Sequence, residues 1–202
     1  MVGLDFQELE MFNFLCAFNY SDLFKNKGLI ARCIAYALLI SHGIRKDTSI
    51  NILIRGYGKD YNLIRLIGRE LRHLRPDERT IWGILNKALI RPRTSLKELR
   101  VHWGVYIIQG ELDDLKDTLR CRDSVVIRKT CEMSVFNIEI EESSPMLFIF
   151  DLNLSTLTAN EYEALGLSNV PKYAIGDIPL DQAIAIVNWI LDNKVRRWTS
   201  RS

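Results

Sequence analysis

The chain has 202 residues, of which 48% are hydrophobic and 26% charged, with 11 Gly and 5 Pro. This length and composition predict one globular domain with a sufficient core, and they exclude a disordered or collagen-like chain. The charge-free stretches near the N-terminus reach only eleven and twelve residues, whereas a bilayer span needs about 20, so we expect no membrane span. The four Cys form no CxxC pair and the three His are scattered. We therefore predict no metal site, and reduced thiols in a cytoplasmic protein.

The first half of the chain begins with two segments of helical character. Residues 6–24 carry apolar side chains at helical spacing, and residues 29–44 predict a helix that ends at Gly43. Two strands are then expected over residues 49–56 and 62–68. Pro76 at a first helical position, followed by two acids, predicts a helix over residues 78–89.

The second half alternates strands with helices. After a turn at residues 90–95 we predict strands at residues 104–110, 124–128, 135–140, 145–150 and 172–176 and helices at residues 111–120, 158–167 and 180–193, with Thr158 as a helix cap. This alternation predicts an α/β fold with a mostly parallel sheet. Ligands of such sheets bind beyond the carboxyl ends of the strands, which points to the loops after Phe150 and Ile175 and to the turn after Arg55.

Positive charge is concentrated in one region. The net charge of the whole chain is +2, but the region from Arg45 to Arg100 has fourteen Lys or Arg against six acids, a local charge of +8. Such a region can bind phosphate-rich partners, or it can be a solvated surface of ion pairs.

Within this region, residues 68–79 hold four arginines and three acids beside a helix start. If the segment is helical, Arg69, Arg72, Arg75 and Arg79 share one face and could bind phosphate. The alternative is an Arg–carboxylate network on the surface. The loop of residues 41–47 contains Ser41, His42, two cations and Asp47, which a helix end also explains. No P-loop, GxGxxG, HExxH or GxSxG motif is present.

Longer motifs carry a family resemblance. The segments ARCIAYALLISHGIRKD, INILIRG and IRLIGRELRHLRPDERTIWGILNKAL, followed by GVYIIQGELDDL and LFIF…YAIGDIPLDQAIAIVNWILD, resemble the TrmY family of SPOUT methyltransferases over about residues 28–192. The resemblance implies one SPOUT-like domain over residues 1–202, in which residues 1–27 diverge from the family. It also implies a sheet flanked by helices, a C-terminal trefoil knot, and a homodimer with its active site at the subunit interface.

The implied activity is S-adenosylmethionine-dependent methylation of N1 of pseudouridine in the tRNA T-loop, at position 54. By the resemblance, the cofactor would be held by Phe150, Gly176, Ile178, Leu180 and Ala183. Asp47 or Asp77 would accept the proton that the ring nitrogen loses. The tRNA backbone would be bound by the arginines Arg32, Arg45, Arg69, Arg72, Arg75 and Arg79. Tyr20, Tyr36 or Trp82 could stack on the target base, although core packing is the more frequent role for Tyr36 and Trp82.

The sequence departs from the family pattern at three positions. Asp151 replaces a Gly, Ala183 stands where a Cys is common, and Gly28 replaces an Asp. The loop of residues 177–182 is also shorter than is usual in the family. These departures leave two alternatives open: a SPOUT-fold RNA-binding protein without cofactor binding, or a methyltransferase acting on another pseudouridine-containing RNA. A third is a dimeric structural protein whose arginines form salt bridges.

Overall fold

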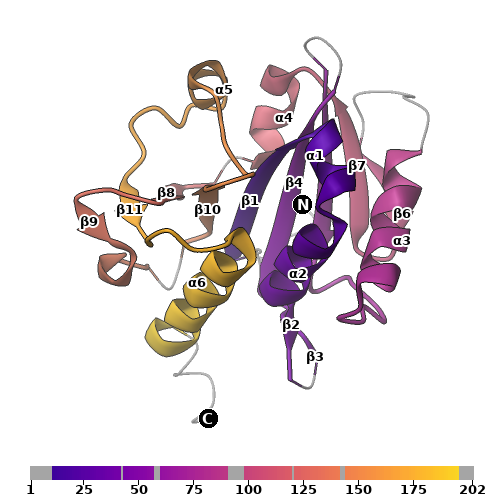
Figure 1. Cartoon of the computed structure of the whole chain (residues 1–202), viewed down its shortest axis with the longest axis horizontal. Helices are drawn as coiled ribbons and strands as arrows, with labels where there is room; N and C mark the ends of the chain where they lie inside the picture. The colour runs from indigo at the N-terminus through magenta and orange to yellow at the C-terminus, as the bar shows by residue number, and fades with distance from the viewer. Residues whose placement is uncertain are drawn as a thin grey trace, which may run out of the picture.

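The computed structural model describes residues 11–41, 43–56, 60–90, 98–119, 121–141 and 144–195. His42 and residues 91–95 of the predicted turn lie outside the described residues. The strands are β1 (Phe12–Asn19), β2 (Leu39–Ile40), β3 (Gly43–Ile44), β4 (Thr48–Arg55), β5 (Tyr61–Ile67), β6 (Leu99–His102), β7 (Val105–Gly110), β8 (Asp123–Arg128), β9 (Met133–Ser134), β10 (Met146–Asp151) and β11 (Lys172–Ala174). The helices are α1 (Tyr20–Lys25), α2 (Lys27–Leu38), α3 (Glu78–Leu89), α4 (Leu112–Leu119), α5 (Ala159–Ala164) and α6 (Leu180–Lys194), with one 3-10 turn, η1 (Val135–Asn137) (Figure 1).

Nine of the strands form a single sheet in the order β6-β7-β5-β4-β1-β10-β8-β11-β9. The pairs from β4 to β9 are parallel, and the pairs from β6 to β4 are antiparallel. The predicted α/β fold with a mostly parallel sheet is therefore confirmed. The strands β1, β4, β10, β8 and β11 end at one edge of the sheet, and the loops beyond this carboxyl edge are where a ligand is expected.

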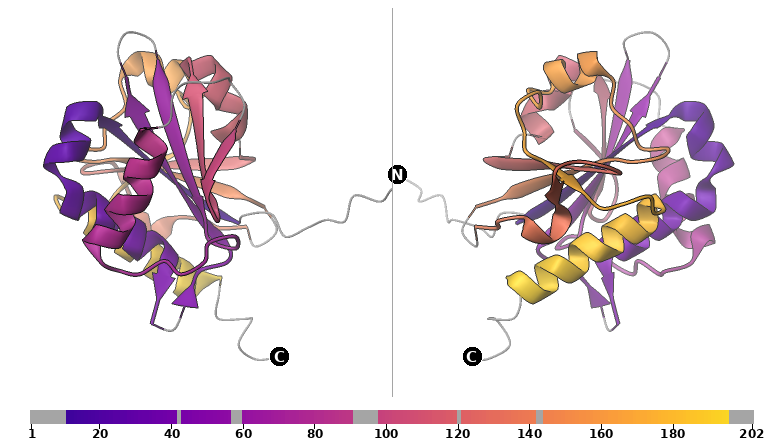
Figure 2. Two further views of the ribbon diagram at one scale, coloured as in Figure 1. Left: turned by 90° about the vertical axis from the view of Figure 1, so that its right-hand side faces the viewer. Right: turned by 60° about the vertical axis from the view of Figure 1, so that its left-hand side comes forward.

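Helices cover both faces of the sheet. Side chains of α2, α3 and α6 pack on one face, where they share a core with Phe14, Ile52 and Phe148. Helices α4 and α5 pack on the other face against Leu15 and Ile149. In the right-hand view of Figure 2, α6 lies alongside the C-terminal loops that follow β10 and β11. Helix α6 is thus placed between those loops and α2, against which it also packs.

The prediction of a helix at the start of the chain was wrong where the structure describes it. Residues 12–19 form β1, the central strand, and residues 12–18 are all buried. A parallel strand covered on both faces is apolar without alternation, so its sequence cannot be distinguished from a buried helix by periodicity. Among the described residues of the predicted segment, only residues 20–24 are helical, as part of α1.

Three smaller expectations also differ from the structure. Helix α2 ends at Leu38, before Gly43, because Leu39–Ile40 pairs with Gly43–Ile44 as the antiparallel β2–β3 ribbon and Arg45 N donates to Leu38 O at 2.7 Å. The predicted strand at residues 135–140 is η1 followed by irregular chain, in which Val135 and Ile138 are both buried, as the three-residue period of a 3-10 turn allows. Residues 68–77 are not helical. The other predicted strands and helices are confirmed within a few residues.

Candidate functional site

Three loops meet beyond the carboxyl ends of β8, β10 and β11. Asn153, which follows β10, donates through Nδ2 to Ile178 O at 2.8 Å. Lys129 Nζ lies 2.6 Å from Asp177 Oδ2, and the Gly176 N–H donates to Lys129 O at 3.1 Å. We call residues 128–129, 151–155 and 175–180 the C-terminal loop site.

The C-terminal loop site contains a cavity of about 390 Å³. Its walls are Leu29 of α2, Asn153 and residues 177–180. Gly176 has φ +92°, and no heavy atom lies within 4 Å of the position where its Cβ would be. A volume of this size, with apolar walls and a few polar groups, is typical of a small-molecule site. The open space at Gly176 lets a ligand approach the backbone, so these residues fit an adenosyl group.

The structure brings together only part of the predicted cofactor set. Gly176, Ile178 and Leu180 belong to the C-terminal loop site. The Phe150 ring is buried and meets Phe14 edge to face, with 5.5 Å between ring centroids. Ala183 is fully buried in α6. The side chains of Phe150 and Ala183 therefore belong to the hydrophobic core next to the site. Their role in cofactor binding stays a prediction.

Asp151, the departure from the family pattern, points away from this cavity. It follows Phe150 in β10, so its side chain lies on the α5 face of the sheet. Its carboxylate is 2.8 Å from Arg128 Nη2 and accepts a hydrogen bond of 2.8 Å from the Tyr162 hydroxyl. Burial, together with this hydrogen bond to Asp151, raises the pKa of Tyr162, so the hydroxyl stays a donor. The carboxylate is therefore held outside the cavity.

A cation and two acids adjoin the C-terminal loop site. Arg32 of α2 pairs with Asp181 at the start of α6, with 2.7 Å between Nε and Oδ2. A Cβ on Gly28 would lie 3.0 Å from Glu78 Oε2 and 3.4 Å from Arg32 Nη1, which places the start of α3 beside the start of α2. Glu78 was not among the predicted site residues, although it lies within the PDER motif.

Asp77, one of the two predicted proton acceptors, caps α3. Its Oδ1 accepts a hydrogen bond of 2.7 Å from Thr80 N. Hydrogen bonds from Thr80 lower the pKa of Asp77, so the carboxylate is ionised at neutral pH. Because Asp77 precedes Glu78, it lies near the start of α2, and its role as proton acceptor stays a prediction.

Asp47, the other predicted acceptor, lies at the opposite edge of the sheet. It precedes β4, whose eight residues separate it from the carboxyl edge by roughly 25 Å. Arg45 lies at the same edge and pairs with Asp192 at the end of α6, at 2.6 and 2.8 Å. The structure does not bring Asp47 and Arg45 to the C-terminal loop site of the same chain.

The remaining predicted arginines lie together on another surface. Arg72, Arg75 and Arg79 are exposed beside the start of α3, and Arg69 Nε lies 4.0 Å from Glu70. The predicted helical face does not exist, yet the irregular segment 68–77 still collects these cations. Arg72 stacks on Trp103, a residue that the sequence analysis missed.

Arg55, which the sequence placed at a ligand-binding turn, forms an ion pair within the chain. Its guanidinium pairs with Glu161 of α5 at 2.6 and 2.7 Å, and Glu161 also accepts a hydrogen bond from Tyr61 at 3.0 Å. Thr158 caps α5 as predicted, in a reciprocal arrangement with Glu161. The end of β4 is therefore linked to α5 by an ion pair.

Aromatic side chains gather near the carboxyl edge as well. Tyr20 and Phe24 of α1 are exposed, with 5.0 Å between their ring centroids, and Phe24 meets Trp82 at 5.3 Å. Lys27 Nζ lies 4.9 Å above Trp82, which is half-buried. Tyr36, in contrast, is exposed on α2. Core packing, the more frequent role for Tyr36, is thus wrong for that residue.

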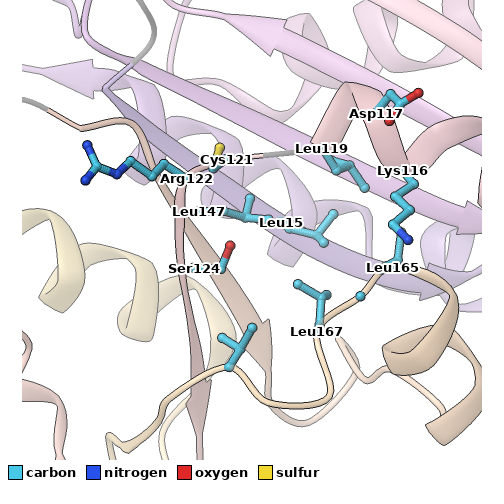
Figure 3. A pocket seen from close by; sticks show the side chains of 12 residues that line it. Leu15, Lys116, Asp117, Leu119, Cys121, Arg122, Ser124, Leu147, Leu165 and Leu167 are labelled. Atoms are coloured by element: carbon cyan, nitrogen blue, oxygen red, sulfur yellow. The ribbon is translucent and has the colours of Figure 1, made fainter.

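A larger cavity lies on the other face of the sheet. It measures about 590 Å³ and has an apolar floor that includes Leu15 and Leu147, with Lys116, Cys121 and Arg122 at its rim (Figure 3). None of the predicted site residues lines it. Among the described residues, no helix is long and apolar enough to cross a membrane. The same residues contain no group of three His, Cys, Asp or Glu suited to a metal ion.

Comparisons with known proteins show which proteins the chain is similar to. The chain is 30% identical over 137 residues to the tRNA (pseudouridine(54)-N(1))-methyltransferase of Methanosarcina acetivorans, covering 66% of this chain and 64% of that protein, less than two thirds of its length. The enzymes of the same name from Methanococcoides burtonii and Methanocella arvoryzae are 26% and 27% identical, over 88% of this chain and 90% and 92% of theirs.

Among solved structures, Archaeoglobus fulgidus Nep1 bound to S-adenosylhomocysteine superimposes with a TM-score of 0.54 at 12% identity, covering 90% of this chain and 96% of that one. This likeness shows a shared fold. The model of the family described as "Putative SAM-dependent RNA methyltransferase" matches residues 25–195. Because that match spans most of the sequence, the chain belongs to this family of RNA methyltransferases.

Proposed function

We propose that the protein methylates N1 of pseudouridine in the tRNA T-loop, at position 54, with S-adenosylmethionine as methyl donor. The family and the names of the curated relatives support this activity. The observation that carries it is the open backbone at Gly176 beside the cavity of the C-terminal loop site, because an enzyme of this kind needs a cofactor cradle.

In this proposal, the walls of the cavity hold the adenosyl group. Leu29, Ile178 and Leu180 supply apolar surface. The backbone at Gly176, whose N–H donates to Lys129 O, leaves open space beside the cavity. When bound, the cofactor supplies an electrophilic methyl group on its sulfonium. The protein's main task is then to position the target nitrogen in line with that methyl group.

The residues around the start of α3 orient the RNA. Arg72, Arg75 and Arg79 bind phosphates, and the exposed rings of Tyr20 and Phe24 provide a stacking surface for a base taken out of the loop. Asp77 accepts the proton from the ring nitrogen, since it is ionised and adjoins α2. Arg32 and Arg69, both near acids, contribute positive charge at the rim.

We further propose a homodimer. Tyr36, Phe136 and Trp189 are exposed, and they come from α2, η1 and α6. Asn188 of α6 donates to the backbone O of Tyr36 at 2.6 Å, which sets α6 beside α2, and the rings of Phe136 and Trp189 meet with 6.5 Å between their centroids. We call these three exposed side chains the apolar strip. A second copy covering this strip would also offer a site for Asp47 and Arg45, which lie far from the loop site of their own chain.

We also propose that the chain forms one SPOUT-like domain with a C-terminal trefoil knot. Strand β10 lies between β1 and β8 while β11 lies beyond β8, and the loops after β10 and β11 are bonded to each other through Asn153. This strand order differs from the order along the chain, and together with the bond between the two loops it supports a threaded C-terminus. The cytoplasmic location expected from the sequence stays a prediction.

Calorimetry with S-adenosylmethionine tests the proposal against its main alternative. The enzyme should release heat at micromolar ligand, and filter binding should show salt-dependent affinity for tRNA. RNA binding without any heat of cofactor binding would identify an RNA-binding protein instead. The absence of both would support a structural protein.

A further inference from the structure

A groove runs between α3 and the β6–β7 hairpin, away from the C-terminal loop site. It measures about 350 Å³. Three cations, Arg72, Arg79 and Lys87, line it, together with His73, His102 and Trp103, and no Asp or Glu is among the described residues that line it. We call it the Trp103 groove.

Two guanidinium groups lie over the Trp103 ring. The Cζ atoms of Arg72 and Arg100 are 4.2 and 4.1 Å from its centroid, and Trp103 itself is 49% exposed. The nearest acids have other partners: Glu70 accepts a hydrogen bond from Tyr106, and Glu98 pairs with Arg65 at 2.9 Å. Stacking thus holds two positive charges close together. Their repulsion costs free energy, and an anionic ligand would offset it.

The backbone fixes this arrangement in place. Gly104, with φ +67°, follows Trp103 in the hairpin turn, and a Cβ there would lie 2.5 Å from Leu71 N and 2.9 Å from Ile67 O. Ile67 N donates to Gly104 O at 2.8 Å. His73 also has a positive φ of 59°. The hairpin turn is therefore docked directly on the segment that carries Arg72, so the indole and the guanidinium are preorganised.

A buried polar atom without a hydrogen-bond partner also indicates that the groove binds a ligand. Nδ1 of His102 is buried and has no hydrogen-bond partner in the structure, and His102 lines the groove. Buried nitrogens without a partner are rare in folded proteins, and they mark places where a ligand or water completes the site.

We propose that the Trp103 groove binds the sugar-phosphate backbone of the tRNA, outside the methylated nucleotide. The inference rests on the proposed function and extends it. Arg79 and Lys87 are eight residues apart on α3, a rise of about 12 Å, so the groove is long enough for more than one phosphate. Guanidinium groups bind phosphate with paired hydrogen bonds, and stacking on a ring leaves their N–H groups in the plane of the guanidinium. Arg100 Nε donates to His102 O at 3.3 Å, so in this proposal its two Nη groups bind the phosphate.

The test compares Arg100→Ala and Arg72→Ala with Arg122→Ala. All three side chains are exposed, and Arg122 lies at the rim of the cavity on the other face of the sheet, so it controls for loss of one charge. Filter binding of unmodified tRNA without cofactor, over a salt series, is the readout. The two groove variants should each lose about tenfold in affinity. Their salt slope should fall by about one unit, while Arg122→Ala should match the wild type.

A second pair of variants separates stacking from structure. Trp103→Phe should keep most of the RNA affinity, whereas Trp103→Ala should lose it even where the melting temperature is unchanged. In methylation assays, Arg100→Ala should raise KM for tRNA and leave kcat and cofactor affinity as in the wild type.

The outcomes distinguish this inference from the proposed function. Groove-dependent tRNA binding by a protein that methylates nothing would refute the enzyme and keep the groove. Methylation with unchanged KM in Arg100→Ala and Arg72→Ala would overturn the groove. Equal tRNA affinity of all variants and the wild type would overturn it as well. That result would also be obtained if the groove bound an acidic protein instead of RNA.

Discussion

Gly176 and Gly166 share a left-handed backbone but differ in their surroundings. Gly176 has φ +92° with open space where its Cβ would be, and Gly166 has φ +72° with only Lys116 nearby, at 3.5 Å. An Ala at either position carries a similar backbone strain. Only Gly176 adjoins the cavity of the C-terminal loop site.

We therefore predict that Gly176→Ala weakens S-adenosylmethionine binding at least tenfold, and that Gly176→Val abolishes it, because the new side chain occupies the cofactor's space. Gly166→Ala should lose comparable stability and keep the wild-type cofactor affinity. Calorimetry measures both, and tRNA affinity should not change in any of the three. Equal cofactor binding by Gly176→Val and the wild type would show that the cofactor site is elsewhere.

The two predicted proton acceptors can be separated by single substitutions. Asp77→Ser keeps a capping oxygen on α3 but removes the carboxylate, so we expect an unchanged melting temperature and a kcat reduced about a hundredfold. Asp47→Asn should leave kcat near that of the wild type. The reverse result would assign the proton to Asp47, and would then require a second subunit at the site.

Residue types alone could not tell which arginines face solvent. Arg45 and Arg75 look alike in the sequence, but Asp192, the partner of Arg45, is 147 positions away. Periodicity within a segment carries no information about such a partner. The cluster at residues 69–79 was identified from charge density, whereas Trp103 and Arg100 were missed because their hairpin is adjacent to Arg72 only in space.

At the scale of elements, the sequence predicted α3, β4, β5, β10 and α6 well. Caps and apolar patterns are local signals, and the predicted Thr158 cap of α5 is another example. It failed for β1 and for the segment at residues 135–140, where tertiary neighbours decide the outcome. β1 is a strand because β4 and β10 pair with it on both sides, and no window of local sequence contains those partners.

The link between β4 and α5 gives an element-scale prediction. Burial raises the pKa of Glu161, but the hydrogen bonds from Arg55 and from Thr158 N outweigh it, and the net pKa lies below the ordinary value of 4.5. A lowered pKa stabilises the fold at any pH above the ordinary value, and this stability is lost as the pH falls through the lowered one. Unfolding in urea should therefore show a loss of wild-type stability below pH 4.5.

Glu161→Gln removes that dependence. It leaves Arg55 without a counter-charge, so we expect a loss of about 3 kcal/mol at pH 7. The difference between wild type and variant should shrink as the pH falls below 4.5. A difference that stays constant across this range would show that the ion pair contributes nothing to stability.

At the scale of the whole molecule, the apolar strip of Tyr36, Phe136 and Trp189 predicts how two copies assemble. Trp189 is 57% exposed on a helix whose other apolar side chains are mostly buried. A Glu placed there would set a charge in the interface, so Trp189→Glu should convert a dimer to a monomer, as measured by light scattering at micromolar concentration. Ile90→Glu, at the C-cap residue of α3, which is 70% exposed, should leave the mass unchanged. A monomeric wild type would contradict the dimer directly.

Nucleoside mass spectrometry tests whether this molecule transfers a methyl group to pseudouridine. A T-arm RNA with pseudouridine at position 54 is incubated with protein and S-adenosylmethionine, digested and analysed. A matched RNA with uridine at that position is the control. We expect a pseudouridine one methyl group heavier in the first RNA only, and no methylated product with Gly176→Val. An unmodified pseudouridine in the presence of wild-type protein that binds both cofactor and RNA would contradict it.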